Sequence, residues 1–237
     1  TGAPALRYFL VMATIVEDAQ PARVGNFVVP ADSPGVSIEQ AWQGLALRSS
    51  GSDDLVLDDV PLPADALLDE RAPAAPDPRG ALGLPWGALI VSSVYTGLAL
   101  AARDECVEFA ASRVPSGLGR PIATIPSVQR RLGEIEALLL TSHRLLYGLA
   151  VDWVERPEAR PMLRAQGALV KTITTNNAVS VTDLALRVIG GAGLRLDMRA
   201  GQLFRDARAG LINAPLDDIA LQNAGKASAD AAARSVS

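Results

Sequence analysis

The chain has 237 residues, of which 49% are hydrophobic and 20% are charged, and its formal net charge is −4. These proportions are typical of a soluble globular protein with one large domain or two smaller ones. The negative balance gives no electrostatic reason to expect DNA, RNA or an anionic membrane as a partner. The aromatic content of 4% is too low for base-stacking platforms. We therefore expect no nucleic-acid partner and no membrane partner.

Metal and thiol chemistry are restricted by composition. Cys106 is the only cysteine and His143 the only histidine, so an intrachain disulfide and a cysteine-based metal site are excluded. His143 lies within a helical pattern and is interpreted as a helix-surface residue, and no metal is expected. The first residues show no signal-peptide pattern, so we expect a cytoplasmic protein.

Residues 1–65 are predicted to form part of a small β domain. Short β-branched and aromatic runs, bounded by Gly, Pro and Asp, indicate strands at residues 8–15, 27–30, 36–38 and 55–57. The proline-rich residues 66–83 are predicted to be a connector without regular structure.

After residue 84 the hydrophobic period becomes helical. Long helices are predicted at residues 85–111, 126–153 and 161–189, then a short amphipathic segment at 202–207 and a helix start at 213–218. We predict an α+β, mostly α fold: a partial small β-barrel-like domain followed by an antiparallel up-and-down four-helix bundle over residues 84–227. The Ala/Ser-rich tail, residues 228–237, is predicted to fray.

One apolar stretch raises the question of a membrane span. Residues 80–102 are uncharged and long enough to cross a bilayer. The stretch includes the polar residues Ser92, Tyr95 and Thr96, and its helical register continues into the charged residues 103–105. We therefore interpret it as a helix buried at the centre of a soluble bundle.

Several segments, taken in order, resemble acyl-CoA dehydrogenases. The segments similar to the middle β domain of that family are Phe27–Val36, Trp42, Gly44–Ser52 and Leu57–Pro63. In the helical half, Ile189–Leu194 matches the family's glycine-rich turn, and Phe204–Ala207 matches the segment before its active-site loop. The resemblance covers about residues 1–227 and implies a flavoprotein oxidoreductase with FAD as cofactor.

The resemblance also implies a missing part. Members of this family begin with an α-helical domain, whereas this chain opens inside the β domain. We expect a truncated or partial polypeptide that lacks the N-terminal helical domain. We expect this shortened chain to bind flavin weakly by itself.

The resemblance assigns cofactor-binding residues to the helical half. In this family the C-terminal domain of one subunit holds the adenosine-diphosphate end of the other subunit's FAD. The residues here that fit this role are Arg113, Gln129, Arg187, Gly190 and Gly191. Arginine forms charge-assisted bonds with pyrophosphate, and glycine lets backbone N–H groups approach it closely. The alternatives stay open that Arg113 is a solvated arginine at a helix end and that the two glycines only stop a helix.

The family's catalytic base is the most informative departure. The resemblance locates this glutamate nine residues after Arg205, where the chain has Ala214, which cannot accept a proton. A second location used in the family falls on residues 86–89, which contain no carboxylate. Asp217 and Asp218 are the nearest acids, but they are interpreted as residues that complement a helix dipole. The catalytic residue is therefore left unassigned.

Three functions remain open. The first is an FAD-dependent dehydrogenase with a relocated base, or a base-less partner in a hetero-oligomer. The second is a monooxygenase that takes reduced flavin from a separate reductase, and the third is a non-catalytic subunit. A small-molecule substrate is expected, with acyl-CoA as the first candidate. The apolar first helix and the small-residue face at Thr172–Thr182 predict a homo-dimer or homo-tetramer.

Overall fold

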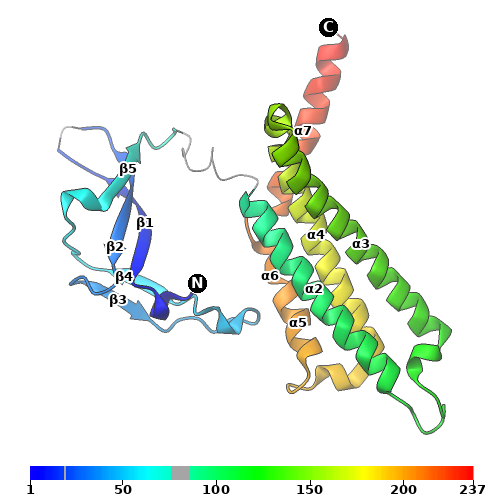
Figure 1. Ribbon diagram of the computed structural model, residues 1–237. Helices are drawn as coiled ribbons and strands as arrows, with labels where there is room; N and C mark the ends of the chain where they lie inside the picture. Colours follow the sequence, from blue (N-terminus) through cyan, green and yellow to red (C-terminus); the bar gives the residue numbers. More distant parts are fainter. Residues whose placement is uncertain (19, 76–85, 237) are drawn as a thin grey trace. The chain divides into compact units, whose positions relative to one another are not determined.

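The computed structural model describes residues 1–18, 20–75 and 86–236. The chain divides into two compact units, Thr1–Leu82 and Gly83–Ser237, which correspond to a strand-rich and a helical part (Figure 1). The mostly helical α+β class predicted from the sequence is confirmed.

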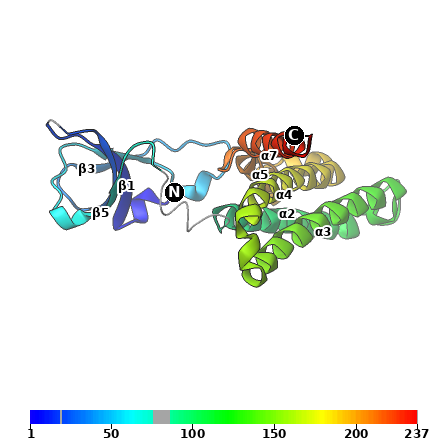
Figure 2. The same ribbon diagram turned by 90° about the horizontal axis from the view of Figure 1, so that it is seen from above.

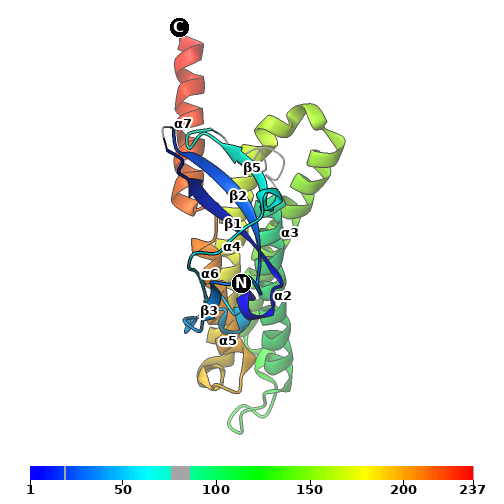
Figure 3. The same ribbon diagram turned by 90° about the vertical axis from the view of Figure 1, so that its left-hand side faces the viewer.

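The first unit consists of two small antiparallel sheets. One sheet has the strand order β1–β2–β5 (Figure 3). Its strands are β1 at Tyr8–Ile15, β2 at Arg23–Pro30 and β5 at Leu67–Arg71. The second sheet pairs β3 at Val36–Glu39 with β4 at Asp54–Leu57.

Alternating side chains of the two sheets form one small core. Phe9 of β1 and Val29 of β2 are buried together with Ala3. Partly buried side chains of the second sheet, including Val36 and Ile38, pack against them. Burial of one strand face explains the alternation of apolar and polar residues in the sequence.

Strand β5 corrects the predicted connector. Residues 66–83 were expected to lack regular structure, but Leu67–Arg71 pairs antiparallel with β2. The prolines lie on either side of this stretch, so the strand keeps its backbone donors. The Asn26 Nδ2 group also donates to Asp69 Oδ1 at 2.7 Å, which ties β5 to β2. The later part of the predicted connector, residues 76–83, lies outside the described residues.

The second unit contains three long helices in succession. They are α2 at Trp86–Ser112, α3 at Pro126–Glu155 and α4 at Arg160–Ile189. The shorter helices α5 at Arg199–Ala207, α6 at Ala209–Ile212 and α7 at Asp217–Val236 follow. The sequence placed the long helices within a few residues. Helix α7 runs to Val236 through the residues predicted to fray, and this tail is rich in alanine, the strongest helix former; the fraying stays a prediction.

Helix α4 lies at the centre of this unit. It contacts α2, α3, α5 and α7, and in Figure 2 it lies between α3 and α5. The main apolar cluster joins α2, α3 and α4 through Leu89, Leu146, Leu149, Trp153, Leu163 and Val170. By length and composition α2 is apolar enough to cross a membrane, yet its buried face packs within the bundle. This packing fits the interpretation of α2 as a core helix.

The small-residue face of α4 lies inside the bundle. Thr174, Thr175, Ala178, Val181 and Thr182 are all buried. The hydroxyl groups of Thr174 and Thr175 both donate to the Lys171 carbonyl oxygen, at 3.1 and 2.9 Å. The expectation that the Thr172–Thr182 face takes part in oligomerisation is therefore wrong, because its neighbours within the chain cover it.

A buried ion pair fastens α7 to α4. Lys171 is fully buried, and its Nζ group donates to Asp217 Oδ1 at 3.0 Å. The Thr172 hydroxyl donates to the same oxygen at 3.2 Å, and the Asn176 amide donates to Asp217 Oδ2 at 2.8 Å. Asp217 is the first residue of α7, so the network fixes where the loop at residues 213–216 ends.

We predict that removing the acceptor of this pair is strongly destabilising. Asp217→Ala leaves the buried Lys171 ammonium without its counter-ion and lowers the free energy of unfolding by about 3–5 kcal/mol. The double variant Lys171→Met with Asp217→Ala recovers part of that loss, because no charge is then buried. Urea denaturation measures both. Arg130→Gln breaks an exposed pair with Glu134 and serves as control; an equal loss in the control would contradict the prediction.

Candidate functional site

A pocket of about 410 Å³ opens where α2 and α4 both end. It is lined by Phe109, Arg113, Pro115, Ile122, Val188, Ile189, Gly191 and Ala192. Apolar side chains form most of the wall, and Arg113 is its one charged lining residue. The combination of an apolar wall with a single cation suits a ligand that has both a flat apolar part and an anionic part.

The connection after α2 folds back to complete this wall. Arg113 follows the last residue of α2, and its carbonyl oxygen accepts the Ile122 N–H at 3.0 Å. The Gly119 N–H donates to the Pro115 carbonyl at 3.0 Å, and Gly119 has a φ of +65° that favours glycine. The closed loop brings Pro115 and Ile122 to the same pocket as Arg113.

The glycine segment after α4 presents bare backbone. Gly190 has φ +69° and ψ −147°, a conformation that only glycine adopts readily, and its N–H caps the Leu186 carbonyl. A Cβ atom built on Gly190 or Gly191 would meet no atom within 4 Å. The space in front of this backbone is therefore open, and a ligand can approach Gly191 at the pocket wall.

Of the five predicted cofactor residues, the structure brings Arg113 and Gly191 into one pocket, with Gly190 adjacent. Within the described residues the Arg113 guanidinium has no hydrogen-bond or ion-pair partner, so it is available to an anion. Arg187 is exposed and pairs with Asp183 on its own helix, Nε to Oδ2, at 2.6 Å. Gln129 is exposed on the first turn of α3. Neither side chain lines the pocket, and the cofactor roles of all five residues stay predictions.

Ala214 stands at the position where the family resemblance leads us to expect the catalytic base. Ala214 is exposed in the segment between α6 and α7 and has no ionisable group. Asp217, the nearest acid, has both carboxylate oxygens engaged by Lys171, Thr172 and Asn176. The role of Asp217 is therefore structural: it pairs with the buried Lys171 and joins α7 to α4. Sequence reasoning missed Lys171, because a lone lysine in a helix is usually exposed.

Two buried groups outside the pocket are held protonated. Burial, and secondarily the charge of Glu105, raises the pKa of the Cys106 thiol to about 11. Burial, with a smaller effect of Asp206, also raises the pKa of Tyr95. A protonated thiol is a weak nucleophile, so Cys106 is a packing residue. Within residues 1–18, 20–75 and 86–236, no cluster of three His, Cys, Asp or Glu side chains could hold a metal ion.

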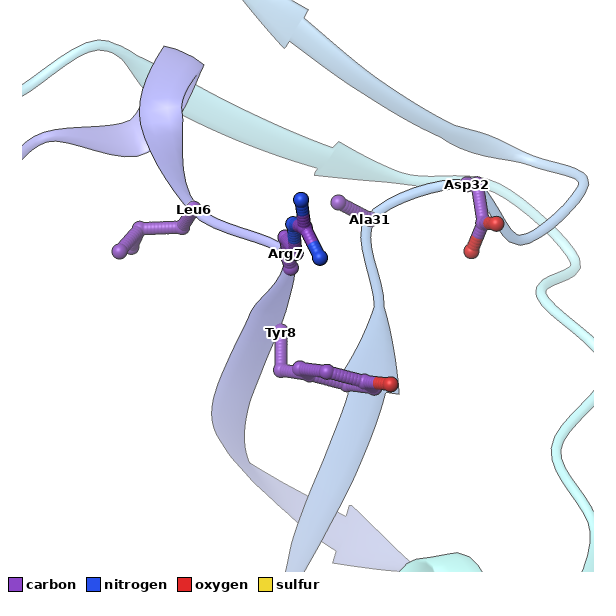
Figure 4. Close-up of a pocket in the computed structure, with 5 residues that line it drawn as sticks. All are labelled: Leu6, Arg7, Tyr8, Ala31 and Asp32. Carbon is purple, nitrogen blue, oxygen red and sulfur yellow. The ribbon is translucent and has the colours of Figure 1, made fainter.

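The strand unit has a pocket of its own, of about 380 Å³. Figure 4 shows Arg7, just before β1, beside Ala31, just after β2, with Asp32 farther along the chain. The Ala31 N–H donates to the Arg7 carbonyl at 2.9 Å. Every lining side chain except Ala31 is exposed, so this is a shallow surface hollow and the weaker candidate.

Comparisons with known proteins identify relatives of this chain. YdbM of Bacillus subtilis, whose name assigns it to the acyl-CoA dehydrogenases, is 41% identical over 92% of this chain and 55% of its own length. The amino sugar nitrososynthase DnmZ of Streptomyces peucetius is 29% identical over 86% of this chain and 50% of its own length. The chain thus spans about half of each relative.

A solved structure shares the fold. KijD3, in complex with FMN and an amino-keto sugar nucleotide, superposes with a TM-score of 0.80 at 25% identity, over 95% of this chain and 56% of KijD3. Residues 81–228 match the family model of the acyl-CoA dehydrogenase C-terminal domain. The matched range includes every residue that lines the Arg113 pocket. The chain belongs to the acyl-CoA dehydrogenase family.

Proposed function

We propose that this protein is a flavin-dependent oxidoreductase whose helical unit holds the adenosine-diphosphate end of FAD in the Arg113 pocket. The observation that carries the proposal is the unpaired Arg113 guanidinium in one pocket with the open backbone at Gly191. FAD, when bound, supplies an acceptor for a hydride.

The residues present fit this part of the cofactor. A guanidinium forms charge-assisted hydrogen bonds with pyrophosphate oxygens, and the absent side chain at Gly191 leaves room for them. Phe109, Ile122 and Val188 supply an apolar wall suited to an adenine ring. We propose the cofactor role for Arg113, Gly190 and Gly191, and treat Gln129 and Arg187 as secondary.

The chain does not carry the usual proton acceptor of its family. At Ala214 a methyl group takes the place of a carboxylate, and Asp217 is held by Lys171. If the substrate is an acyl-CoA, its α-proton must therefore leave through a different group. This absence is why we propose an oxidoreductase without assigning a catalytic residue.

The same absence favours a second candidate, a reduced-flavin-dependent monooxygenase. Such an enzyme needs no base for an α-proton. DnmZ is named as an amino sugar nitrososynthase and KijD3 was solved with FMN and an amino-keto sugar nucleotide, so relatives of this fold include proteins other than acyl-CoA dehydrogenases. A non-catalytic partner subunit is the third candidate.

We further propose that the protein is cytoplasmic and forms a homo-dimer or homo-tetramer.

The cofactor proposal predicts that Arg113→Gln weakens FAD binding roughly 10- to 100-fold, since a hydrogen bond to a charged group contributes about 1.5–3 kcal/mol. Gly191→Val should also weaken binding, because its side chain enters space that is open in the folded chain. Titration of flavin-free protein, expressed from its natural start codon, measures the effect. Arg120→Gln, in the same connecting loop but outside the pocket, is the matched control. Equal affinities for all three would refute the assignment.

The chemical proposal predicts that saturated acyl-CoAs do not bleach the oxidised flavin rapidly. Without a base at Ala214, proton abstraction loses roughly 10²–10⁴-fold in rate. Anaerobic mixing with a panel of acyl-CoAs, followed at the long-wavelength flavin band, tests this. Ala214→Glu should restore measurable bleaching, whereas Ala227→Glu, which adds the same charge on α7, should not. Rapid bleaching of the unmodified protein would show that another residue is the base.

A further inference from the structure

Helix α5 is capped by a side chain that belongs to α2. The two helices are in contact (Figure 1), and the Ala200 N–H, in the first turn of α5, donates to Glu105 Oε1 of α2 at 3.0 Å. Met198, which directly precedes α5, makes no side-chain cap of its own. A carboxylate at a helix N-terminus satisfies a backbone donor and complements the positive end of the helix dipole. Glu105 therefore fixes the start of α5 from a position 95 residues earlier in the chain.

The second carboxylate oxygen of Glu105 is not explained by this cap. Glu105 Oε2 is buried and has no hydrogen-bond partner among the described residues. Burial of an unpaired polar atom costs stability, and more so when the group is charged. A leucine at this position would fill a similar volume and leave no polar side-chain atom unpaired. Residues that break a local rule at such a cost are concentrated at functional sites.

Glu105 lies on the face of α2 that leads to the Arg113 pocket. Phe109 and Arg113, which both line that pocket, follow Glu105 at four and eight residues. The Arg113 N–H donates to the Phe109 carbonyl at 2.9 Å, so helical hydrogen bonding continues as far as Arg113. Residues four apart share one face of a helix. Glu105 is therefore one helical turn away from the nearest residue of the pocket wall.

The first turn of α5 supports the opposite wall of the pocket, the glycine turn at Gly190–Leu194. Gly201 follows Ala200, and a Cβ atom built on Gly201 would lie 2.8 Å from the Gly193 carbonyl oxygen. The two backbones therefore touch without a side chain between them. Gly191, which lines the pocket, is two residues away from Gly193. A displacement of the start of α5 would thus be passed directly to the pocket wall.

We propose that Glu105 is a positioning residue for the cofactor pocket. By capping α5 it holds Gly201 against the glycine turn, and so sets the distance between Gly191 and Arg113. The inference rests on the proposed binding of FAD in the Arg113 pocket. When the cap is lost, the turn spends part of its time out of place, and the apparent affinity for FAD falls in proportion to the competent fraction.

Titration of the flavin-free, full-length protein with FAD tests this role. Glu105→Leu should weaken binding roughly 5- to 10-fold, the effect of losing one capping interaction. Glu105→Gln should bind as the unmodified protein does, because the amide oxygen keeps the cap and only the unpartnered oxygen is replaced. The matched control is Glu108→Leu, the same change at an exposed position of α2. Unchanged affinity in Glu105→Leu, or equal losses in the Leu and Gln variants, would overturn the proposal.

Urea denaturation separates positioning from a purely structural role. In Glu105→Leu the lost cap is offset by removal of the buried unpaired oxygen, so the midpoint should stay close to that of the unmodified protein. FAD affinity should fall nevertheless. A lowered midpoint with unchanged affinity would assign Glu105 to the fold alone and contradict the proposal.

A second variant disturbs the same contact from the other side. Gly201→Ala places a methyl group against the Gly193 carbonyl and should weaken FAD binding, although alanine is the better helix former. Gly225→Ala, on α7 where a Cβ meets nothing within 4 Å, is its control. Equal affinities for these two variants would show that the start of α5 does not set the pocket wall.

Hydrogen exchange of the flavin-free protein gives a readout that needs no cofactor. Amides of residues 190–194 should exchange faster in Glu105→Leu than in Glu105→Gln. Unchanged exchange, with FAD binding still weakened by Arg113→Gln, would refute the role of Glu105 and leave the cofactor proposal standing. Unchanged FAD affinity in Arg113→Gln would instead show that the pocket is not the cofactor site, and would overturn both.

Discussion

The helical unit closes around a buried ion pair between Lys171 and Asp217. A fully buried ammonium carries a desolvation cost of several kcal/mol, so the bundle cannot close around Lys171 unless an acceptor is in place. That acceptor is the first residue of α7, and Thr172 and Asn176 complete its hydrogen bonds. The pair therefore determines where α7 starts and where the preceding loop at residues 213–216 must end.

This constraint bears on the loop before α7 as well as on stability. Asp217 is the acid nearest in the sequence to Ala214, and both of its carboxylate oxygens are engaged by Lys171, Thr172 and Asn176. The Arg113 pocket lies at Ile189. Along α4 this residue is about 27 Å from Lys171, at a rise of about 1.5 Å per residue. The pocket and the buried ion pair thus lie at different places along α4.

Sequence periodicity predicted the three long helices because each buries one face of a regular spiral. It failed at β5, where flanking prolines concealed a strand whose pairing partner is β2, far away in the chain. It also missed Lys171, because a partner 46 residues away leaves no local signal. The family resemblance implied that Arg113, Gln129 and Arg187 bind the cofactor together. Only Arg113 lines the pocket, because the rotation of each helix about its axis decides which side chains face it. That rotation depends on packing between helices, which a single sequence does not reveal.

Packing within the chain also buries the small residues of α4 that were expected to form an oligomer contact. Small residues at Thr172–Thr182 allow close helix approach, and α2 and α3 use that closeness within the chain. Once α4 is covered, the bundle places its remaining large apolar side chains elsewhere, and the outer face of α3 carries four of them in one row. Apolar area exposed to water costs about 25 cal/mol per Å², which association recovers in part. The central helix thus stabilises the helical unit, and the outer helix α3 keeps large apolar side chains exposed.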